Sequence, residues 1–142
     1  MQSNLVKDWM SADPISVEPE STLPDAHDLM KKHNIRRLLV MDGSKLVGIV
    51  TRGDIRGAEP SEATSLSIFE VNYLLARFPV KKIMSTDIIT VGVNEPVGKA
   101  ASIMHENKVS GLPVVDNGHV VGIITESDIF RMVVREWETQ TA

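Results

Sequence analysis

Short apolar runs separated by polar turns recur along the chain and predict β-hairpins. The runs cover residues 38–41, 46–50, 112–115 and 120–124. Glycine, aspartate and asparagine cluster between the members of each pair, at residues 42–45 and 116–119, and such clusters favour tight turns. A two-residue alternation, Ile15-Ser16-Val17 in one half and Ile89-Thr90-Val91 in the other, adds a small edge strand to each hairpin.

Two amphipathic helices of about three turns are predicted, one before each hairpin. Ser21 or Thr22 caps the first helix and Asn94 caps the second, with Pro24 and Pro96 just inside. The apolar positions at helical spacing are Ala26, Leu29 and Met30 in the first helix, and Val97, Ala100, Ala101 and Met104 in the second.

Further helices are expected near Arg52 and Glu126, after each hairpin, and in the linker, residues 61–79. The linker carries apolar residues at helical spacing, namely Ile68, Val71, Leu75 and Phe78. The C-terminal helix carries a broad apolar stripe of Phe130, Val133, Val134 and Trp137. A stripe of this width needs a partner, so it either packs on its own chain or forms a homodimer interface.

The predicted elements occur twice because residues 6–56 match residues 80–130 without an insertion or deletion. Eighteen of the fifty-one paired positions are identical. Repetition at this period indicates two copies of one supersecondary unit. Because each copy is too small to bury a sufficient core alone, we expect the copies to pack around a pseudo-twofold axis. The predicted organisation is repeat 1 at 1–60, the linker helix at 61–79 and repeat 2 at 80–138, in an α/β (α+β) fold where two helices cover each small sheet.

The composition and net charge exclude several classes of function. A chain of 142 residues with 42% apolar residues suits one shared core, and a net charge of −4 with interspersed signs disfavours nucleic-acid binding. The absence of cysteine excludes disulfides and cysteine-based metal or redox sites. No apolar stretch is long enough to span a bilayer, so we expect a cytoplasmic protein without a membrane partner.

Each hairpin ends in a motif whose polar side chains suit ligand binding. Thr51 is followed three positions later by Asp54, and Thr125 by Asp128. A threonine and an acid at this spacing form a helix capping box, which needs no ligand. The same turn also suits a nucleotide, because helix-terminal N–H groups and the hydroxyl face a phosphate while the carboxylate accepts ribose hydroxyls. Both interpretations remain open at this point.

Basic residues distinguish the two motifs. Arg36 and Arg37 precede the first buried strand and Arg52 lies within the first motif, so three guanidinium groups can serve one anion site. The equivalent positions in the second repeat are Ser110, Gly111 and Glu126. We therefore expect two unequal sites.

Both repeats resemble cystathionine-β-synthase (CBS) domains, and the pair resembles a Bateman module. The resemblance covers about residues 4–137 and rests on the starts Val-Lys-Asp-Trp-Met-Ser and Val-Lys-Lys-Ile-Met-Ser, the segments at 37–42 and 111–116, and the ends Gly-Ile-Val-Thr-Arg-Gly-Asp and Gly-Ile-Ile-Thr-Glu-Ser-Asp. The connecting stretch, residues 63–75, is also similar to that of the acetoin-utilisation protein AcuB and its relatives.

The resemblance implies an adenosine-type ligand, AMP, ADP or ATP, with S-adenosylmethionine as the alternative. It also implies that each site combines the Thr/Asp turn of one repeat with the beginning of the other. Site one would use Asp54 for ribose, Thr51, Arg36 and Arg37 for phosphate, with Arg52 as an addition, and the backbone of Asp87, Ile88 and Ile89 for adenine. Site two would use Asp128, Thr125, Asp13, Pro14 and Ile15, with Val109 and Ser110.

No residue pattern supports catalysis or a metal site. The histidines, His27, His33, His105 and His119, form no ligand pair on one helix face. The favoured hypothesis is a non-catalytic nucleotide sensor that forms a homodimer and regulates an unidentified protein. The alternatives are a constitutive interaction module whose Thr/Asp turns are only helix caps, and a nucleotide hydrolase.

Overall fold

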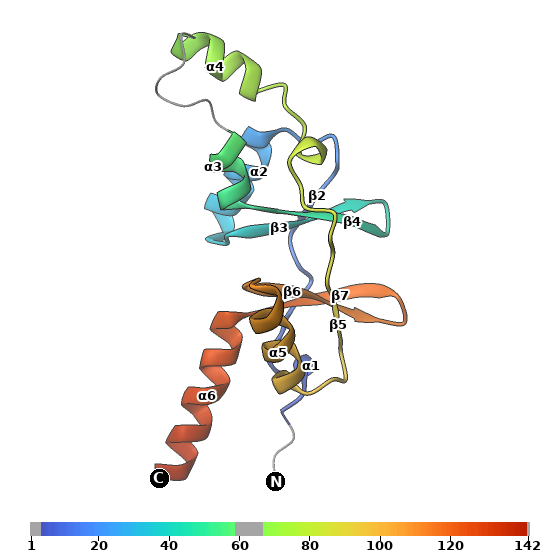
Figure 1. Cartoon of the computed structure of the whole chain (residues 1–142), viewed down its shortest axis with the longest axis vertical. Coiled ribbons are helices and arrows are strands. Elements are labelled where there is room, and N and C mark those ends of the chain that lie inside the picture. The colour runs from blue at the N-terminus through green and yellow to red at the C-terminus, as the bar shows by residue number, and fades with distance from the viewer. Residues whose placement is uncertain (1–3, 59–66, 142) are drawn as a thin grey trace. The chain divides into compact units, whose positions relative to one another are not determined.

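The computed structural model describes residues 4–58 and 67–141, which form two compact units (Figure 1). Unit 2 spans Ile15 to Ile88, and unit 1 combines the chain up to Pro14 with the chain from Ile89 onward. The opening segment of each repeat, residues 4–14 or 80–88, therefore belongs to the unit built on the other repeat. Each unit is a product of both repeats.

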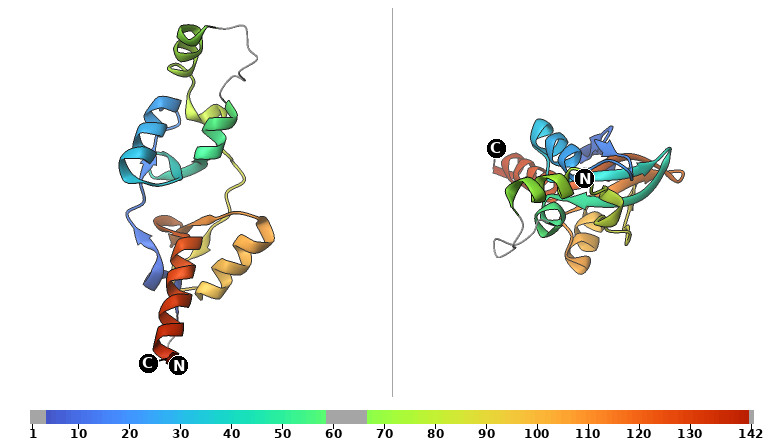
Figure 2. Two further views of the ribbon diagram at one scale, coloured as in Figure 1. Left: turned by 90° about the vertical axis from the view of Figure 1, so that its left-hand side faces the viewer. Right: turned by 90° about the horizontal axis from the view of Figure 1, so that it is seen from above.

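Unit 2 contains a three-stranded sheet with strand order β2-β3-β4. Strands β2 (Ser16–Val17) and β3 (Arg37–Asp42) are parallel, and β3 forms an antiparallel hairpin with β4 (Lys45–Thr51). Helices α2 (Leu23–His33) and α3 (Arg52–Ala58) lie side by side against this sheet (Figures 1 and 2). Helix α4 (Ile68–Leu75) and a single 3₁₀ turn, η1 (Val80–Lys82), complete the unit.

Unit 1 has the same plan with one strand more, in the order β1-β7-β6-β5. Its strands are β1 (Ser11–Ala12), β5 (Val91–Gly92), β6 (Gly111–Asp116) and β7 (His119–Thr125), and its helices are α1 (Val6–Trp9), α5 (Val97–Asn107) and α6 (Glu126–Thr141). The predicted hairpins and edge strands are confirmed, except that β5 begins at Val91. Helix α1 and strand β1 had no clear signal in the sequence pattern.

The described residues form two cores rather than the one shared core predicted from the composition, and the two cores use equivalent positions of the repeats. Buried members of unit 2 include Val17, Leu23, Ala26, Met30, Leu38, Val40 and Val50, and those of unit 1 include Val91, Val97, Ala100, Met104, Leu112, Val114 and Ile124. The exchanged opening segments complete both cores, because Val80 is fully buried in unit 2 and Val6 in unit 1. This exchange explains why neither repeat alone supplies a closed core.

The start of α2 follows the prediction, and the start of α5 does not. The Thr22 hydroxyl accepts from the Asp25 N–H at 3.3 Å, so Thr22 is the N-cap. The predicted cap Asn94 is wrong, since α5 begins after Pro96. There the Val97 N–H donates to the Asn4 carbonyl at 2.9 Å, and the Val6 N–H donates to the Glu95 carbonyl at 2.8 Å. The opening segment therefore accepts the hydrogen bond from the helix-terminal N–H group that a capping side chain would otherwise have accepted.

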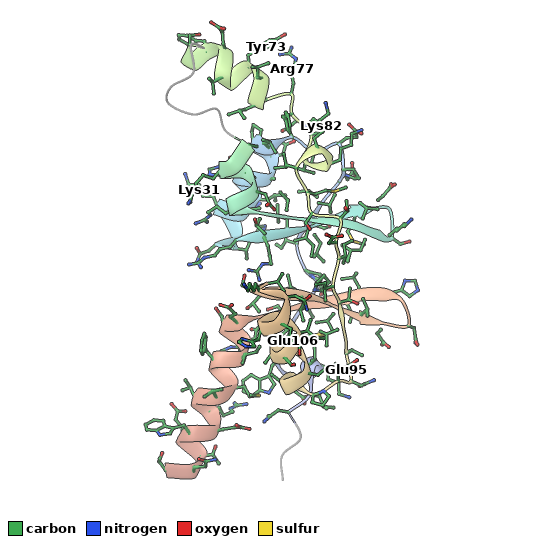
Figure 3. All side chains as sticks on the ribbon, viewed as in Figure 1. Lys31, Tyr73, Arg77, Lys82, Glu95 and Glu106 are labelled. Atoms are coloured by element: carbon green, nitrogen blue, oxygen red, sulfur yellow. The ribbon has the colours of Figure 1, made fainter. Side chains whose placement is uncertain are left out.

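The linker prediction falls partly on residues 61–66, which lie outside the described residues. The rest contains α4 and the turn that follows it, where Arg77 lies 3.8 Å from the centre of the Tyr73 ring (Figure 3). Leu75 and Phe78 pack against the unit 2 core, while Tyr73 is exposed. Over the ranges 4–58 and 67–141, the structure contains no helix with the length and apolar character that a membrane span requires.

Candidate functional site

The first turn, residues 51–54, joins β4 to α3 and forms a reciprocal capping box. The Thr51 N–H donates to Asp54 Oδ2 at 2.8 Å, and the Asp54 N–H donates to Thr51 Oγ1 at 3.1 Å. The two residues thus satisfy two backbone donors at the helix start. Both side chains are half-buried. The capping interpretation is therefore correct. The two capping hydrogen bonds leave some donor and acceptor atoms of the turn without a partner.

Two polar groups of the first turn remain available. Thr51 Oγ1 acts as an acceptor here, and the structure gives its hydroxyl hydrogen no acceptor among the described residues. Within the same ranges, Asp54 Oδ1 has no hydrogen-bond or ion-pair partner. An ionised carboxylate accepts about four hydrogen bonds. The turn therefore offers one hydroxyl donor and one carboxylate oxygen to a ligand.

The backbone of all three predicted arginines lies in or beside the first turn. Arg37 lies opposite Thr51 in the β3–β4 ladder, and the Arg52 N–H donates to the Arg36 carbonyl at 2.8 Å. Arg36 and Arg52 are exposed, and no carboxylate in the described part of the chain pairs with either of them. The local charge is therefore positive beside the Asp54 carboxylate.

The opening segment of repeat 2 reaches this turn along β4. Ser85 and Ile49 exchange backbone hydrogen bonds of 2.8 and 3.0 Å. A Cβ on Gly48 would overlap the Met84 thioether, so the glycine permits this close approach. The contact brings Asp87 and Ile88 into the unit that holds Thr51 and Asp54, whereas Ile89 belongs to unit 1.

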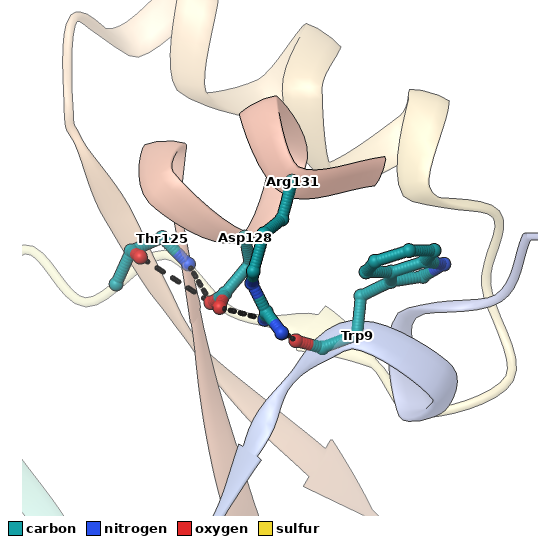
Figure 4. A network of polar contacts seen from close by, with 4 residues as sticks. All are labelled: Trp9, Thr125, Asp128 and Arg131. Atoms are coloured by element: carbon teal, nitrogen blue, oxygen red, sulfur yellow. Dashed lines mark hydrogen bonds and ion pairs between the residues drawn. The ribbon is translucent and has the colours of Figure 1, made fainter. Parts of the chain in front are cut away.

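The second turn, residues 125–128, joins β7 to α6 with a different polar arrangement. The Thr125 N–H donates to Asp128 Oδ2 at 2.8 Å, and the Thr125 hydroxyl also donates to Oδ2, at 3.3 Å. Arg131 Nη2 lies 2.6 Å from Asp128 Oδ1 and donates to the Trp9 carbonyl at 3.1 Å (Figure 4). Both carboxylate oxygens of Asp128 are thus engaged within the protein.

Burial also distinguishes the second turn. Asp128 is the buried charged residue of the described chain, at 7% exposure. Arg131 and Arg135 lie over the Trp9 ring, at 5.6 and 5.3 Å from its centre. These side chains line a groove of about 620 Å³ between α1 and α6. The Arg131 guanidinium therefore links the Asp128 carboxylate to Trp9.

Of the other predicted residues of site two, Ser110 contacts this turn, whereas the antiparallel pairing of β1 with β7 carries the chain away from Thr125 as it reaches Asp13. The Glu126 N–H donates to the Ser110 carbonyl at 3.1 Å, and Val109 packs against the unit 1 core. Asp13 and Pro14 follow β1, which pairs with β7. Asp13 adopts a left-handed conformation with φ of 53°. Ile15 belongs to unit 2, unlike the rest of its predicted site.

Sequence reasoning missed Arg131 and Trp9. An acid and an arginine three positions apart on a helix are a recognisable pair, and Asp128 and Arg131 have this spacing. The contact with Trp9 had no comparable signal, because it joins residues 122 positions apart. Among the described residues, no group of three or more potential metal ligands occurs.

Comparison with known proteins identifies the family. The family model for the CBS domain matches the chain twice, over residues 6–61 and 80–135. The chain belongs to the CBS domain family. Its two small sheets and their helices match the fold of solved CBS pairs.

Three solved CBS structures illustrate the similarity. The CBS domain pair of protein MJ0100, in complex with 5′-methylthioadenosine and S-adenosyl-L-methionine, is 34% identical with a TM-score of 0.79, covering 95% of this chain and 99% of that one. A putative acetoin utilization protein (AcuB) from Vibrio cholerae is 31% identical with a TM-score of 0.80, covering 99% and 97%. CBSX2 in complex with AMP is 25% identical with a TM-score of 0.76, covering 93% and 97%.

The first curated relatives are longer than the CBS pair. Inosine-5′-monophosphate dehydrogenase of Korarchaeum cryptofilum is 39% identical over 119 residues, which are 83% of this chain and 22% of the relative. The chain spans about a fifth of the length of the first curated relatives that it matches. The similarity is therefore confined to a segment of each of these three relatives.

Proposed function

We propose that this CBS pair is a non-catalytic regulatory module that binds an adenosine-type nucleotide, AMP, ADP or ATP, at the first turn. Asp54 accepts the ribose hydroxyls, and Thr51 with Arg36, Arg37 and Arg52 holds the phosphate. The backbone at residues 87–89 borders the adenine. Binding favours one arrangement of the chain, and an unidentified partner protein responds to that arrangement.

The observation that carries this proposal is the unused polar capacity of the capping box. Thr51 and Asp54 already cap α3, yet a hydroxyl hydrogen and one carboxylate oxygen have no partner in the described chain. A ribose donates two adjacent hydroxyls, and a phosphate accepts from a hydroxyl and from arginine. The free groups of the turn therefore complement the sugar and phosphate of one nucleotide.

The positive charge around the first turn favours the phosphate of a nucleotide over the sulfonium group of S-adenosylmethionine. Arg36 and Arg52 are exposed and have no carboxylate partner in the described ranges. Guanidinium groups bind phosphate oxygens in a forked geometry and repel a cation. The related MJ0100 pair contains S-adenosyl-L-methionine and CBSX2 contains AMP, so both ligand types merit a test. We expect AMP and ATP to bind more tightly than S-adenosylmethionine.

A thermal-shift series tests the proposal. The purified chain is heated with AMP, ADP, ATP, adenosine, S-adenosylmethionine or GMP, the last as a control for the base. A ligand at about one hundred times its Kd stabilises the protein by about 2.7 kcal/mol. We expect stabilisation by the adenine nucleotides and less by GMP. No shift with any compound at millimolar concentration would refute nucleotide sensing.

A second candidate function is a constitutive interaction module that forms a homodimer. The exposed apolar stripe of α6 supports it: Phe130 is 67% exposed and Trp137 is 63% exposed. Apolar side chains gathered on one helix face mark an association surface. Light scattering with and without AMP separates the two functions. A constitutive module gives one mass under both conditions and no nucleotide-dependent melting shift.

A further inference from the structure

Both oxygens of the Asp128 carboxylate have partners within the protein. Its Oδ2 atom accepts from the Thr125 N–H and hydroxyl, and its Oδ1 atom pairs with Arg131 at 2.6 Å (Figure 4). A ribose diol needs a carboxylate with accessible acceptor positions. The Asp128 side chain is 10% exposed while the Arg131 side chain is 63% exposed, so the arginine lies between the carboxylate and solvent.

Arg131 is fixed by more than a surface ion pair. An isolated exposed pair contributes little and exchanges readily with water. Here one guanidinium contacts the carboxylate, donates to the Trp9 carbonyl at 3.1 Å and lies 5.6 Å above the Trp9 ring. Trp9 is a buried member of the unit 1 core. The arginine is thus anchored to the core, and a ligand would have to break several contacts at once.

Repeat 1 lacks this arrangement. The residue equivalent to Arg131 is Gly57, and the residue equivalent to Trp9 is Ile83. A Cβ placed on Gly57 would meet no atom of the described residues within 4 Å, so the corresponding space beside the first turn is open as far as those residues show. The second turn also lacks the arginines of the first, since Ser110 and Glu126 replace Arg36 and Arg52.

We propose that Arg131 holds the second turn closed, so that one chain binds one adenosine-type nucleotide, at the first turn. Removing the arginine frees Asp128 and opens a second site. Arg131 is therefore a positioning residue that determines the number of ligands. The inference rests on the proposed function and adds the stoichiometry and its cause.

Equilibrium dialysis with radiolabelled AMP tests this inference, because it counts bound nucleotide per chain. We expect one AMP per wild-type chain and two per Arg131→Ala chain, with the second site gaining about tenfold or more in affinity. Adding Asp128→Asn to Arg131→Ala should restore the count of one. Arg131→Gln, which keeps a donor for the Trp9 carbonyl, should also bind two and guards against misfolding of the alanine variant.

Arg135→Ala is the matched control. It removes the same charge from the same helix and the same tryptophan ring, and no carboxylate pairs with Arg135 in the described chain. It should bind one AMP. Two AMP per wild-type chain, or one per chain in both Arg131 variants, would overturn the inference. No binding by any variant would instead refute the proposed function, so the two failures are distinguishable.

Discussion

The two Thr/Asp turns share their residues and differ in how they use them. At the first turn the Thr51 hydroxyl accepts from the Asp54 N–H, which leaves the hydroxyl hydrogen to a ligand. At the second turn the Thr125 hydroxyl donates to Asp128, and Arg131 takes the remaining carboxylate oxygen. Both turns cap a helix, but within the described residues only the first has a carboxylate oxygen without a partner.

This difference originates outside the duplicated motif. Thr and Asp are identical in the two repeats, whereas the residues three positions after each Asp are Gly57 and Arg131. The opening segments differ as well, with Trp9 beside the second turn and Ile83 in the equivalent position. The two repeats therefore share the Thr and Asp of the cap, and they differ in the residues that surround it.

The strongest test of the comparison replaces one carboxylate at a time. Asp54→Asn keeps an oxygen for the Thr51 N–H but removes the charge that accepts the ribose hydroxyls. We expect it to weaken AMP binding about 10- to 100-fold, because a hydrogen bond to a charged group contributes about 1.5–3 kcal/mol. Calorimetric titration measures the change. Asp128→Asn is the control and should leave the AMP affinity unchanged; equal losses in both variants would contradict the inequality of the turns.

A second test compares the glycines at which the opening segments meet the hairpins. A Cβ on Gly122 would lie 2.7 Å from the Ser11 carbonyl oxygen, whereas the three atoms nearest a Cβ on Gly48 all belong to the Met84 side chain. Ser11 belongs to β1 and cannot move without disturbing its pairing with β7. Overpacking costs about 1–3 kcal/mol. We expect Gly122→Ala to lower the free energy of unfolding by about 2 kcal/mol, near the middle of that range.

Gly48→Ala should cost about 1 kcal/mol, because Met84 can adopt another rotamer. Urea denaturation measures both variants against the wild type. If Gly48→Ala is the more destabilising substitution, backbone contact does not control the packing of the opening segments.

The hairpins, the edge strands and α2 were predictable because their signals are local. Alternation identified the strand that contains Val17, and Thr22 marked a helix start through its own side chain. The cap at Asn94 was wrong because a distant carbonyl, that of Asn4, satisfies the Val97 N–H. The exchange of opening segments was likewise unpredictable from patterns, since it depends on packing between residues far apart in sequence.

The candidate site shows the same division. The capping box of Thr51 and Asp54 followed from spacing alone, and the register of β3 and β4 placed Arg37 opposite Thr51 as the hairpin required. The closure of the second turn did not follow from spacing, because Arg131 needs the Trp9 carbonyl and ring from α1. Local motifs predict the groups that are present, and only tertiary structure shows which of them are occupied.

A further test of the difference between the two turns introduces an arginine beside the first turn. Gly57→Arg places a guanidinium three positions after Asp54, with open space around the new Cβ. We expect the AMP Kd to rise about fivefold relative to Gly57→Ala, which has the same backbone effect without the charge. The effect should be smaller than the closure of the second turn, because Ile83 offers no ring for stacking. Equal or tighter binding by Gly57→Arg would contradict the role given to the arginine.

The smallest expected effect concerns the phosphate. Arg52 is exposed, so its removal should weaken ATP binding only about threefold, as expected for a solvent-screened charge, and adenosine binding hardly at all. Lys31→Ala removes an exposed positive charge from α2 of the same unit and serves as the control. Titrations with ATP and adenosine at low and moderate salt measure the ratio. An equal loss for both ligands would assign Arg52 to the structure of the turn, because a residue that contacts only the phosphate cannot affect a ligand without one.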